Sequence, residues 1–182
     1  MSKRSESHLV WMDLEMTGLN PDSDSILEIA TLITNDGLEI VAEGPSLAVH
    51  HPQSVLDQMD AWNKEHHAQS GLIERVLAST TSMAAAEAQT LAFVKTYCVE
   101  RQSPLCGNSI WQDRRFVCRY MPRLDGYLHY RNIDVSTVKE LVRRWFPKGV
   151  QPPEKKHAHL ALDDIRESIV ELQFYREHYF RG

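Results

Sequence analysis

The first third of the chain alternates apolar and polar residues with the two-residue period of β-strands. Residues 9–14 and 26–34 are rich in branched apolar side chains, and Asn35-Asp36-Gly37 is typical of a turn. The extended pattern then resumes at residues 38–42 and continues at 47–50. We therefore expect three antiparallel strands in this part of the chain.

After Pro52 the apolar spacing becomes that of helices. Helices are predicted at residues 54–59, 63–69, 72–77, 82–97, 114–120, 137–146 and 161–180. Two short strands are predicted between them, at residues 104–107 and 132–135, and a loop at 148–156. Strands followed by helices that alternate with short strands predict an α/β three-layer sandwich around a mixed sheet.

The composition of the 182 residues is that of one compact domain, because 42% are apolar and 25% are charged. We expect a single domain over residues 1–182, with residues 1–7 as a flexible N-terminus. Three cysteines, Cys98, Cys106 and Cys118, form no paired motif and indicate reduced thiols in the cytoplasm. No apolar run reaches the length of about 18 residues that a membrane helix needs, so no membrane partner is expected.

The charge balance limits the kind of anion that the chain can bind. Twenty basic residues stand against 25 acidic ones, which gives a net charge of -5 with nine neutral histidines. Such a chain is not expected to hold long nucleic acid by bulk charge. An anionic substrate should therefore be short, or be bound through a metal ion.

Asp13 and Glu15 are two residues apart on the first predicted strand, so their side chains point to the same face. They lie at the end of an apolar strand and are followed at once by Thr17-Gly18, a position where sites in α/β sheets gather. This setting favours a shared cation. The alternative is a strand edge that turns toward solvent.

Asp113 lies three or four residues before the apolar residues Phe116 and Val117, which places its side chain beside the core. An acidic residue in this position could instead serve only to stabilise the helix dipole.

The last predicted helix carries Asp163 and Asp164 near its start. Its apolar stripe lies about 100° from Asp164 and about 160° from Asp163, so Asp164 is expected to face the site. His159 falls in the segment that leads into this helix, where it can swing toward a substrate or simply lie at the surface.

Four carboxylates and a histidine suit phosphodiester hydrolysis. Two divalent cations, Mg²⁺ or Mn²⁺, would balance four acidic charges and could align a water and stabilise a leaving oxygen. A histidine whose pKa is near neutrality could take the proton from that water.

Three stretches resemble the exonuclease motifs of the DEDD superfamily, with a histidine in the third motif. They are Asp13-Leu14-Glu15-Met16-Thr17-Gly18, residues 107–113 and residues 159–166. Over about residues 9–179 the chain is similar to the oligoribonuclease family, including His129-Tyr130-Arg131 and residues 134–137. Trp111 departs from the pattern, since a smaller residue is expected there.

The resemblance implies a ribonuclease H-like three-layer sandwich with a central mixed five-stranded sheet. It also implies 3′-to-5′ hydrolysis of short oligoribonucleotides, especially dinucleotides, to 5′-mononucleotides. By the same likeness, His159 is the general base, and the metal ligands are Asp13, Glu15, Asp113 and Asp164. Members of the family are homodimers, in which a tyrosine that matches Tyr130 completes the neighbouring subunit's site.

A dinucleotide offers two bases and few phosphates, so its affinity should come from stacking and from capture of its end. Candidates to wedge or stack are Leu19, Trp62 and either His66 or His67, of which His67 is the better family match. Trp62 could alternatively cap the core beside a helix. Ser109 belongs to the second motif and is a further candidate contact.

The end of the substrate has its own candidate contacts. Ser136 and Thr137 precede a predicted helix, and Glu140 completes a capping box with Thr137. Together with Arg131, this helix start could hold a terminal 5′-phosphate.

Two other functions remain open: a proofreading-type exonuclease that acts on DNA, and a catalytically silent binding module. The arginine clusters at residues 114–123 and 143–144 are read as solvated helix faces. The histidine pairs His50/His51 and His157/His159 lack the spacing of a zinc site.

Overall fold

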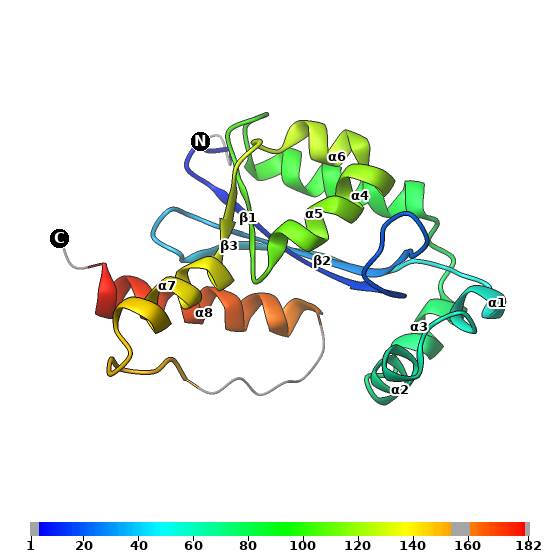
Figure 1. The fold of residues 1–182 in the computed structure, drawn as a ribbon. Helices are drawn as coiled ribbons and strands as arrows, with labels where there is room; N and C mark the ends of the chain where they lie inside the picture. Colours follow the sequence, from blue (N-terminus) through cyan, green and yellow to red (C-terminus); the bar gives the residue numbers. More distant parts are fainter. Residues whose placement is uncertain (1–3, 154–160, 181–182) are drawn as a thin grey trace.

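A five-stranded mixed sheet forms the centre of the molecule in the computed structural model, which describes residues 4–153 and 161–180 (Figure 1). Its strand order is β3-β2-β1-β4-β5. The strands are β1 (Leu9–Met16), β2 (Ile26–Thr34), β3 (Ile40–Ala48), β4 (Leu105–Gly107) and β5 (Asn132–Asp134). The first three pair antiparallel, while β4 and β5 run parallel to β1, so the predicted five-stranded mixed sheet is confirmed.

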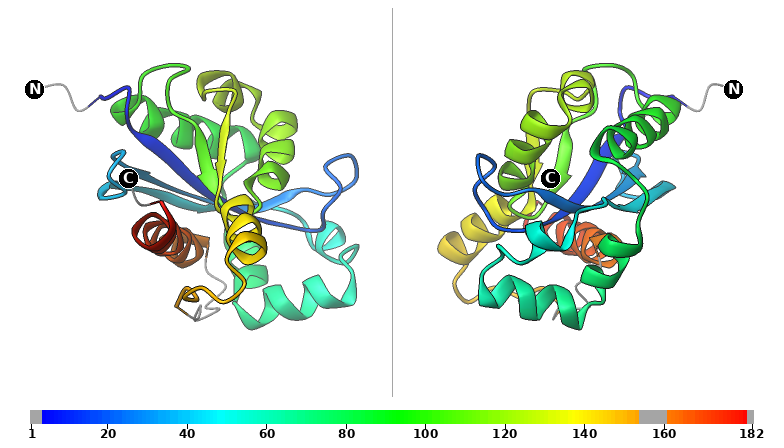
Figure 2. Two further views of the ribbon diagram at one scale, coloured as in Figure 1. Left: turned by 60° about the vertical axis from the view of Figure 1, so that its left-hand side comes forward. Right: turned by 90° about the vertical axis from the view of Figure 1, so that its right-hand side faces the viewer.

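The two faces of the sheet are covered by different helices, as Figures 1 and 2 show. On one face lie α4 (Met83–Tyr97), α5 (Ile110–Tyr120) and α6 (Pro122–Tyr127). The other face is covered by α7 (Val135–Trp145) and α8 (Ala161–Tyr179). These layers make the three-layer sandwich that the sequence predicts.

Successive side chains of β1 point alternately into the two apolar cores, one on each face of the sheet. Val10, Met12 and Leu14 belong to the core under α4, α5 and α6, whereas Trp11 belongs to the core under α8. Strand β2 is buried along its whole length, and β1 lies in the middle of the sheet between β2 and β4. Odd-numbered side chains of β1 therefore point toward α8.

Beyond one end of the sheet, a third, smaller core joins α1 (Gln53–Leu56) and α3 (Leu72–Ala78) to β2, and α2 (Ala61–Gln69) packs on α3. Leu27 of β2 packs there against Leu56, Leu72 and Val76. This contact holds α2 and α3 close to the ends of β1 and β2.

The structure corrects several predicted boundaries. Strand β1 continues to Met16, β3 is one strand across residues 40–48, and α5 begins at Ile110 instead of residue 114. Helix α6 was not predicted, because it begins with Pro122 and contains Gly126. It is stabilised from a distance, since buried Glu87 accepts hydrogen bonds from the backbone of Arg123 and Leu124.

The predicted capping box of Thr137 and Glu140 is wrong. Asp134 caps α7 instead, and its side chain accepts a hydrogen bond from the Ser136 N–H at 3.0 Å. Glu140 points to solvent and pairs with Arg143.

At the start of the chain, Ser5 forms an isolated bridge with Cys98, although this segment was expected to be flexible. Within residues 4–153 and 161–180, no helix combines the length and the apolar character needed to cross a membrane.

Candidate active site

Three carboxylates meet where the end of β1 approaches the start of α8. Asp13 and Glu15 are odd-numbered residues of β1 and so share the face that α8 covers. Asp164 lies in the first turn of α8. One oxygen from each of Asp13, Glu15 and Asp164 lies within 4.8 Å of the others, which is close enough to hold one cation.

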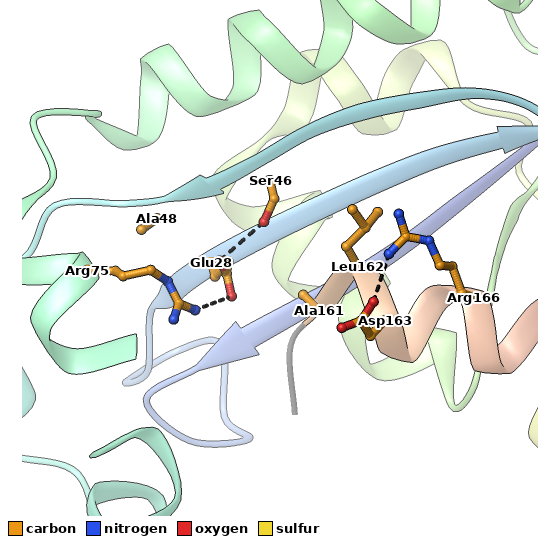
Figure 3. Close-up of a pocket in the computed structure, with 8 residues that line it drawn as sticks. All are labelled: Glu28, Ser46, Ala48, Arg75, Ala161, Leu162, Asp163 and Arg166. Carbon is orange, nitrogen blue, oxygen red and sulfur yellow. Dashed lines mark hydrogen bonds and ion pairs between the residues drawn. The ribbon is translucent and has the colours of Figure 1, made fainter. Parts of the chain in front are cut away.

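The neighbouring acid, Asp163, lies outside this group. Its carboxylate accepts a hydrogen bond from Arg166 at 2.7 Å (Figure 3). Arg166 also pairs with Glu43 on β3. The helical turn thus turns Asp163 toward the edge of the sheet and Asp164 toward β1.

Asp113 approaches β1 from the opposite layer and lies outside the group of three acids within 4.8 Å. It lies in the first turn of α5, is only 6% exposed, and accepts a hydrogen bond from the Leu14 N–H at 3.1 Å. This bond attaches the start of α5 to β1 between the two acids of the strand. The charge of Asp113 also raises the pKa of both Asp13 and Glu15.

Burial is the largest cause of the shifted pKa values in this cluster. It raises the pKa of Asp13 well above its usual range, with Asp113 and Glu15 adding repulsion. It raises the pKa of Glu15 to about 8, with Asp164 and Glu28 adding to the shift. It also raises the pKa of Asp113 to about 7, although the Leu14 N–H opposes this. The cluster therefore concentrates negative charge that a cation would relieve.

The donor set fits a hard divalent cation. All the ligand atoms are carboxylate oxygens, which suit Mg²⁺ and Mn²⁺ better than softer metals. Asp13, Glu15 and Asp164 would hold the ion, and Asp113 is close enough to contribute its charge.

Comparisons with known proteins agree with this geometry. A family model described as Exonuclease matches residues 10–172. An oligoribonuclease of Pseudomonas paraeruginosa is 57% identical over 178 residues, which cover 98% of this chain and 99% of that relative. The chain belongs to the oligoribonuclease family. An oligoribonuclease of Alkalilimnicola ehrlichii is 59% identical over 97% of this chain and 92% of its own length.

The fold of this oligoribonuclease family member also occurs in larger exonucleases. An Exonuclease I from Methylocaldum szegediense superposes with a TM-score of 0.75 at 17% identity, over 96% of this chain and 41% of that one. Escherichia coli Exonuclease I in complex with an oligonucleotide gives a TM-score of 0.74 at 14% identity, over 96% and 41%. The chain spans about two fifths of the length of these structures, and at this identity the likeness shows the fold alone.

A fifth acid near the cluster, Glu28, was missed by the sequence analysis. It is the cross-strand partner of Glu15 and is buried, with Arg75 of α3 at 3.0 Å and the Ser46 hydroxyl at 3.2 Å (Figure 3). These residues border a cavity of about 470 Å³ that Asp163 and Arg166 also line. An acid in the middle of an otherwise apolar strand was the signal that could have revealed it.

His67 is not available to stack on a base, because it is only 2% exposed. Its Nε2 lies 2.9 Å from the Met16 carbonyl, so that nitrogen donates, and Nδ1 points toward Glu15 at 3.8 Å. Nδ1 has no hydrogen-bond partner among the described residues. Burial lowers the pKa of His67, which favours the neutral ring.

The exposed apolar side chains next to the cluster are Leu19 and Trp62. Leu19 is 70% exposed and Trp62 is 67% exposed, so Trp62 does not cap the core. Both line a cavity of about 600 Å³ that begins at Thr17 and Gly18, directly after β1. Trp62 stacks on His66 with ring centroids 4.7 Å apart, so His66 supports the exposed ring.

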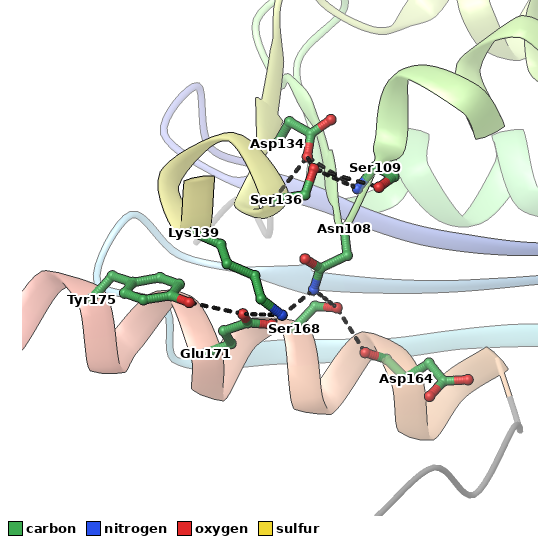
Figure 4. Close-up of polar contacts among 9 residues, drawn as sticks. All are labelled: Asn108, Ser109, Asp134, Ser136, Lys139, Asp164, Ser168, Glu171 and Tyr175. Atoms are coloured by element: carbon green, nitrogen blue, oxygen red, sulfur yellow. Dashed lines mark hydrogen bonds and ion pairs between the residues drawn. The ribbon is translucent and has the colours of Figure 1, made fainter. Parts of the chain in front are cut away.

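The second motif connects to α8 and α7 through polar contacts, which Figure 4 shows. The Asn108 amide donates to the Ser168 hydroxyl and to buried Glu171, at 2.9 and 3.1 Å. The Ser168 hydroxyl in turn donates to the Asp164 carbonyl at 2.8 Å. This chain of bonds fixes the first turn of α8 relative to β4.

Ser109 adopts a left-handed backbone conformation, and its N–H donates to Asp134 at 3.0 Å (Figure 4). Ser136 bonds the same carboxylate through its hydroxyl at 2.6 Å. Ser109 and Ser136 therefore meet at the start of α7, where Thr137 is exposed. Arg131 is exposed nearby in sequence, with its guanidinium 5.2 Å from the centre of the Tyr130 ring.

Tyr130 is 73% exposed and packs only against its sequence neighbours His129 and Arg131 among the contacts described. His159 lies outside the described residues.

Proposed function

We propose that this chain hydrolyses short oligoribonucleotides from their 3′ ends to 5′-mononucleotides, with dinucleotides as preferred substrates. The observation that carries the proposal is the meeting of Asp13, Glu15 and Asp164 within 4.8 Å in a chain that is 57% identical to an oligoribonuclease over nearly its full length. A metal-dependent nuclease uses such a group of oxygens to hold its cations beside the scissile phosphate.

Two divalent cations, Mg²⁺ or Mn²⁺, are the proposed cofactors. When bound by Asp13, Glu15, Asp113 and Asp164, they would supply Lewis-acid activation of the phosphodiester and a water of lowered pKa. Charge balance supports two ions, because four carboxylates offer four negative charges.

His159 is the proposed general base. It precedes Asp164 by five residues in the third motif, as the family pattern requires. A neutral imidazole can accept the proton of the attacking water near neutral pH. The role of His159 rests on the sequence motif.

Exposed side chains near the carboxylate cluster are the proposed substrate contacts. Leu19 and Trp62 flank a cavity of about 600 Å³ beside the cluster and offer apolar surfaces for bases, each stack being worth about 1–3 kcal/mol. Ser109, Ser136 and Thr137, together with Arg131, are proposed to bind the terminal 5′-phosphate, which would measure the length of the substrate. His67 is proposed to act by holding Met16 and facing Glu15 instead of by stacking.

The proposed assembly is a homodimer of single-domain chains in which Tyr130 completes the partner's site. The exposure of Tyr130 supports this, since a large aromatic ring at 73% exposure gains little from its own chain. A cytoplasmic location is proposed on the free cysteines Cys98, Cys106 and Cys118. The net charge of -5 supports short RNA over long nucleic acid.

Turnover of a 5′-phosphorylated diribonucleotide tests the function. The purified protein should release mononucleotides from this diribonucleotide with Mg²⁺ or Mn²⁺. It should release them more slowly from the corresponding DNA dinucleotide or from long single strands. Equal or faster hydrolysis of long single-stranded DNA would favour the proofreading-type alternative. Binding of the dinucleotide without any cleavage would favour a silent binding module.

A further inference from the structure

The tip of the loop that carries Leu19, residues 17–25, is fastened to helix α5. The Gln112 side-chain amide donates to the Leu19 carbonyl at 2.6 Å. At the last residue of α5, the Tyr120 hydroxyl approaches the far side of the loop, at 2.6 Å from the Asp24 carbonyl and 3.2 Å from the Pro21 carbonyl. Both ends of the loop's tip are thus held by side chains of one helix.

The loop is also closed by hydrogen bonds between its own residues. The Thr17 N–H donates to the Ser25 carbonyl at 3.0 Å, and the Asp24 carboxylate accepts from the Asn20 N–H at 2.9 Å. A Cβ added to Gly18 would lie 2.6 Å from that carboxylate, which shows how tightly the loop is packed. Its position over the site therefore depends on the contacts with α5.

Gln112 is adjacent in sequence to Asp113, the acid that α5 presents to β1. One turn of α5 therefore determines the position of both the Asp113 carboxylate and the exposed Leu19 side chain. Because Gln112 holds the backbone carbonyl, the Leu19 side chain is left free to project into the cavity shared with Trp62.

We propose that Gln112 is a positioning residue for base recognition: its hydrogen bond to the Leu19 carbonyl fixes the height of the Leu19 side chain against the substrate bases. The inference rests on the proposed function, in which Leu19 contacts a base. Arg115 also donates to the Leu19 carbonyl, at the longer distance of 3.4 Å, and to the Gln112 side-chain oxygen at 2.8 Å, so Gln112 holds Arg115 in place as well. Without Gln112 the shorter bond to the carbonyl is lost and Arg115 loses its partner, so the loop samples other positions and binding of a two-base substrate must first select the correct one.

Gln112→Met tests this, because methionine matches glutamine in length and cannot donate. KM for a diribonucleotide should rise about three- to tenfold, as expected for the loss of one hydrogen bond, with kcat nearly unchanged. The p-nitrophenyl ester of a nucleoside 5′-phosphate carries one base only, and its kinetics should change much less. Hydrogen exchange of the backbone amides in residues 17–25 should become faster in the variant.

Two further variants complete the design. Tyr120→Phe removes the second fastening and should give the same selective rise in KM. Arg119→Ala removes an exposed ion pair with Asp22 at 3.2 Å and the contact of the guanidinium with the Tyr120 ring at 5.9 Å, but it leaves both Gln112 and the Tyr120 hydroxyl in place. It should therefore match the wild type.

Leu19→Ala separates failure of this inference from failure of the proposed function. If Leu19→Ala selectively impairs the dinucleotide and Gln112→Met does not, the positioning role is wrong. If Gln112→Met impairs both substrates equally through kcat, the helix acts through Asp113 and the inference is overturned. If Leu19→Ala has no selective effect, the base contact and the inference both fail, whereas cleavage of the dinucleotide by the wild type still supports the proposed activity.

Discussion

Glu15 of β1 and Glu28 of β2 are direct cross-strand partners at the edge of the carboxylate cluster. Like charges in this relationship repel each other and destabilise a sheet. Arg75 of α3 lies 3.0 Å from Glu28 and opposes the rise in the pKa of Glu15. Helix α3 therefore contributes the positive charge that allows an acidic residue to stay buried beside the site.

Replacing Arg75 with methionine should destabilise the cation-free protein by about 1–2 kcal/mol. The change leaves Glu28 buried opposite Glu15 without its partner, and the effect is moderated because Arg75 is 38% exposed. Urea unfolding near neutral pH measures it. The double variant Arg75→Met/Glu28→Gln should recover most of the loss, and a double variant as unstable as the single one would contradict this account.

Much of the fold could be predicted from local patterns. Strands β1 and β2 and helices α4 and α8 show the period of their structure over many residues, and the structure confirms each of them. Strand β3 was divided because Gly44 and Pro45 interrupt its pattern. It is an edge strand, where proline is tolerated, and a Cβ at Gly44 would lie 2.5 Å from the Phe93 ring.

The residues of the site also fall into those that local patterns predict and those that depend on distant packing. The strand period indicated that Asp13 and Glu15 share a face, and the helix turn indicated that Asp164, not Asp163, faces the site. That these acids belong to one metal site was implied by the resemblance to the exonuclease motifs. Glu28 and Arg75 were missed because their pairing joins residues 47 positions apart. The burial of His67 also depends on such distant packing, since the Met16 carbonyl that binds it lies 51 positions away.

The stability of the cation-free protein should fall as pH rises from about 4.5 to about 8. Across this window the native protein keeps the proton on Glu15, whose pKa is raised from 4.5 to about 8, while the unfolded chain has already released it. Asp113, with a pKa raised to about 7, acts in the same direction. The native state thus binds more protons than the unfolded state, and deprotonation removes that advantage.

A divalent cation should reverse this loss, because it binds the deprotonated carboxylates. The rise in Tm caused by Mg²⁺ or Mn²⁺ should be larger near pH 8 than near pH 6, and each kcal/mol gained corresponds to about 2–4 °C. Thermal unfolding at both pH values, with and without the metal, tests the prediction. An equal rise at both would show that cation binding is not linked to these protons.

Asp13→Asn should lower activity at least about a hundredfold while stabilising the cation-free protein near pH 8. The substitution removes a cation ligand and also one of the charges whose repulsion raises the pKa values in the cluster. Asp163→Asn is the matched control, because Asp163 pairs with Arg166 outside the cluster and should keep nearly full activity. If Asp13→Asn lowers both activity and stability, the charge at this position does not oppose folding.

Arg114 anchors the segment that presents Tyr130. Its guanidinium donates to the His129 carbonyl at 2.9 Å, to the Asn132 side chain at 2.7 Å and to Asp125 at 3.1 Å. If Tyr130 completes the partner's site, Arg114 should act on that site through this segment. Tyr130→Ala and Arg114→Met should each lower activity while leaving cation-induced stabilisation intact.

Mixing inactive subunits distinguishes action in the partner's site from action in the same chain. A dimer of one Tyr130→Ala chain and one Asp13→Asn chain contains one complete site, made of Asp13 from the first chain and Tyr130 from the second. After random exchange of subunits, half of the dimers are mixed and activity should return to about one quarter of the wild-type value. Arg114→Met should complement Asp13→Asn in the same way, because its intact Asp13 meets an ordered Tyr130 segment from the other chain. If mixing Tyr130→Ala with Asp13→Asn restores no activity, Tyr130 acts in the site of its own chain. If only the mixture with Arg114→Met stays inactive, Arg114 acts on the site through Asp113 of its own helix.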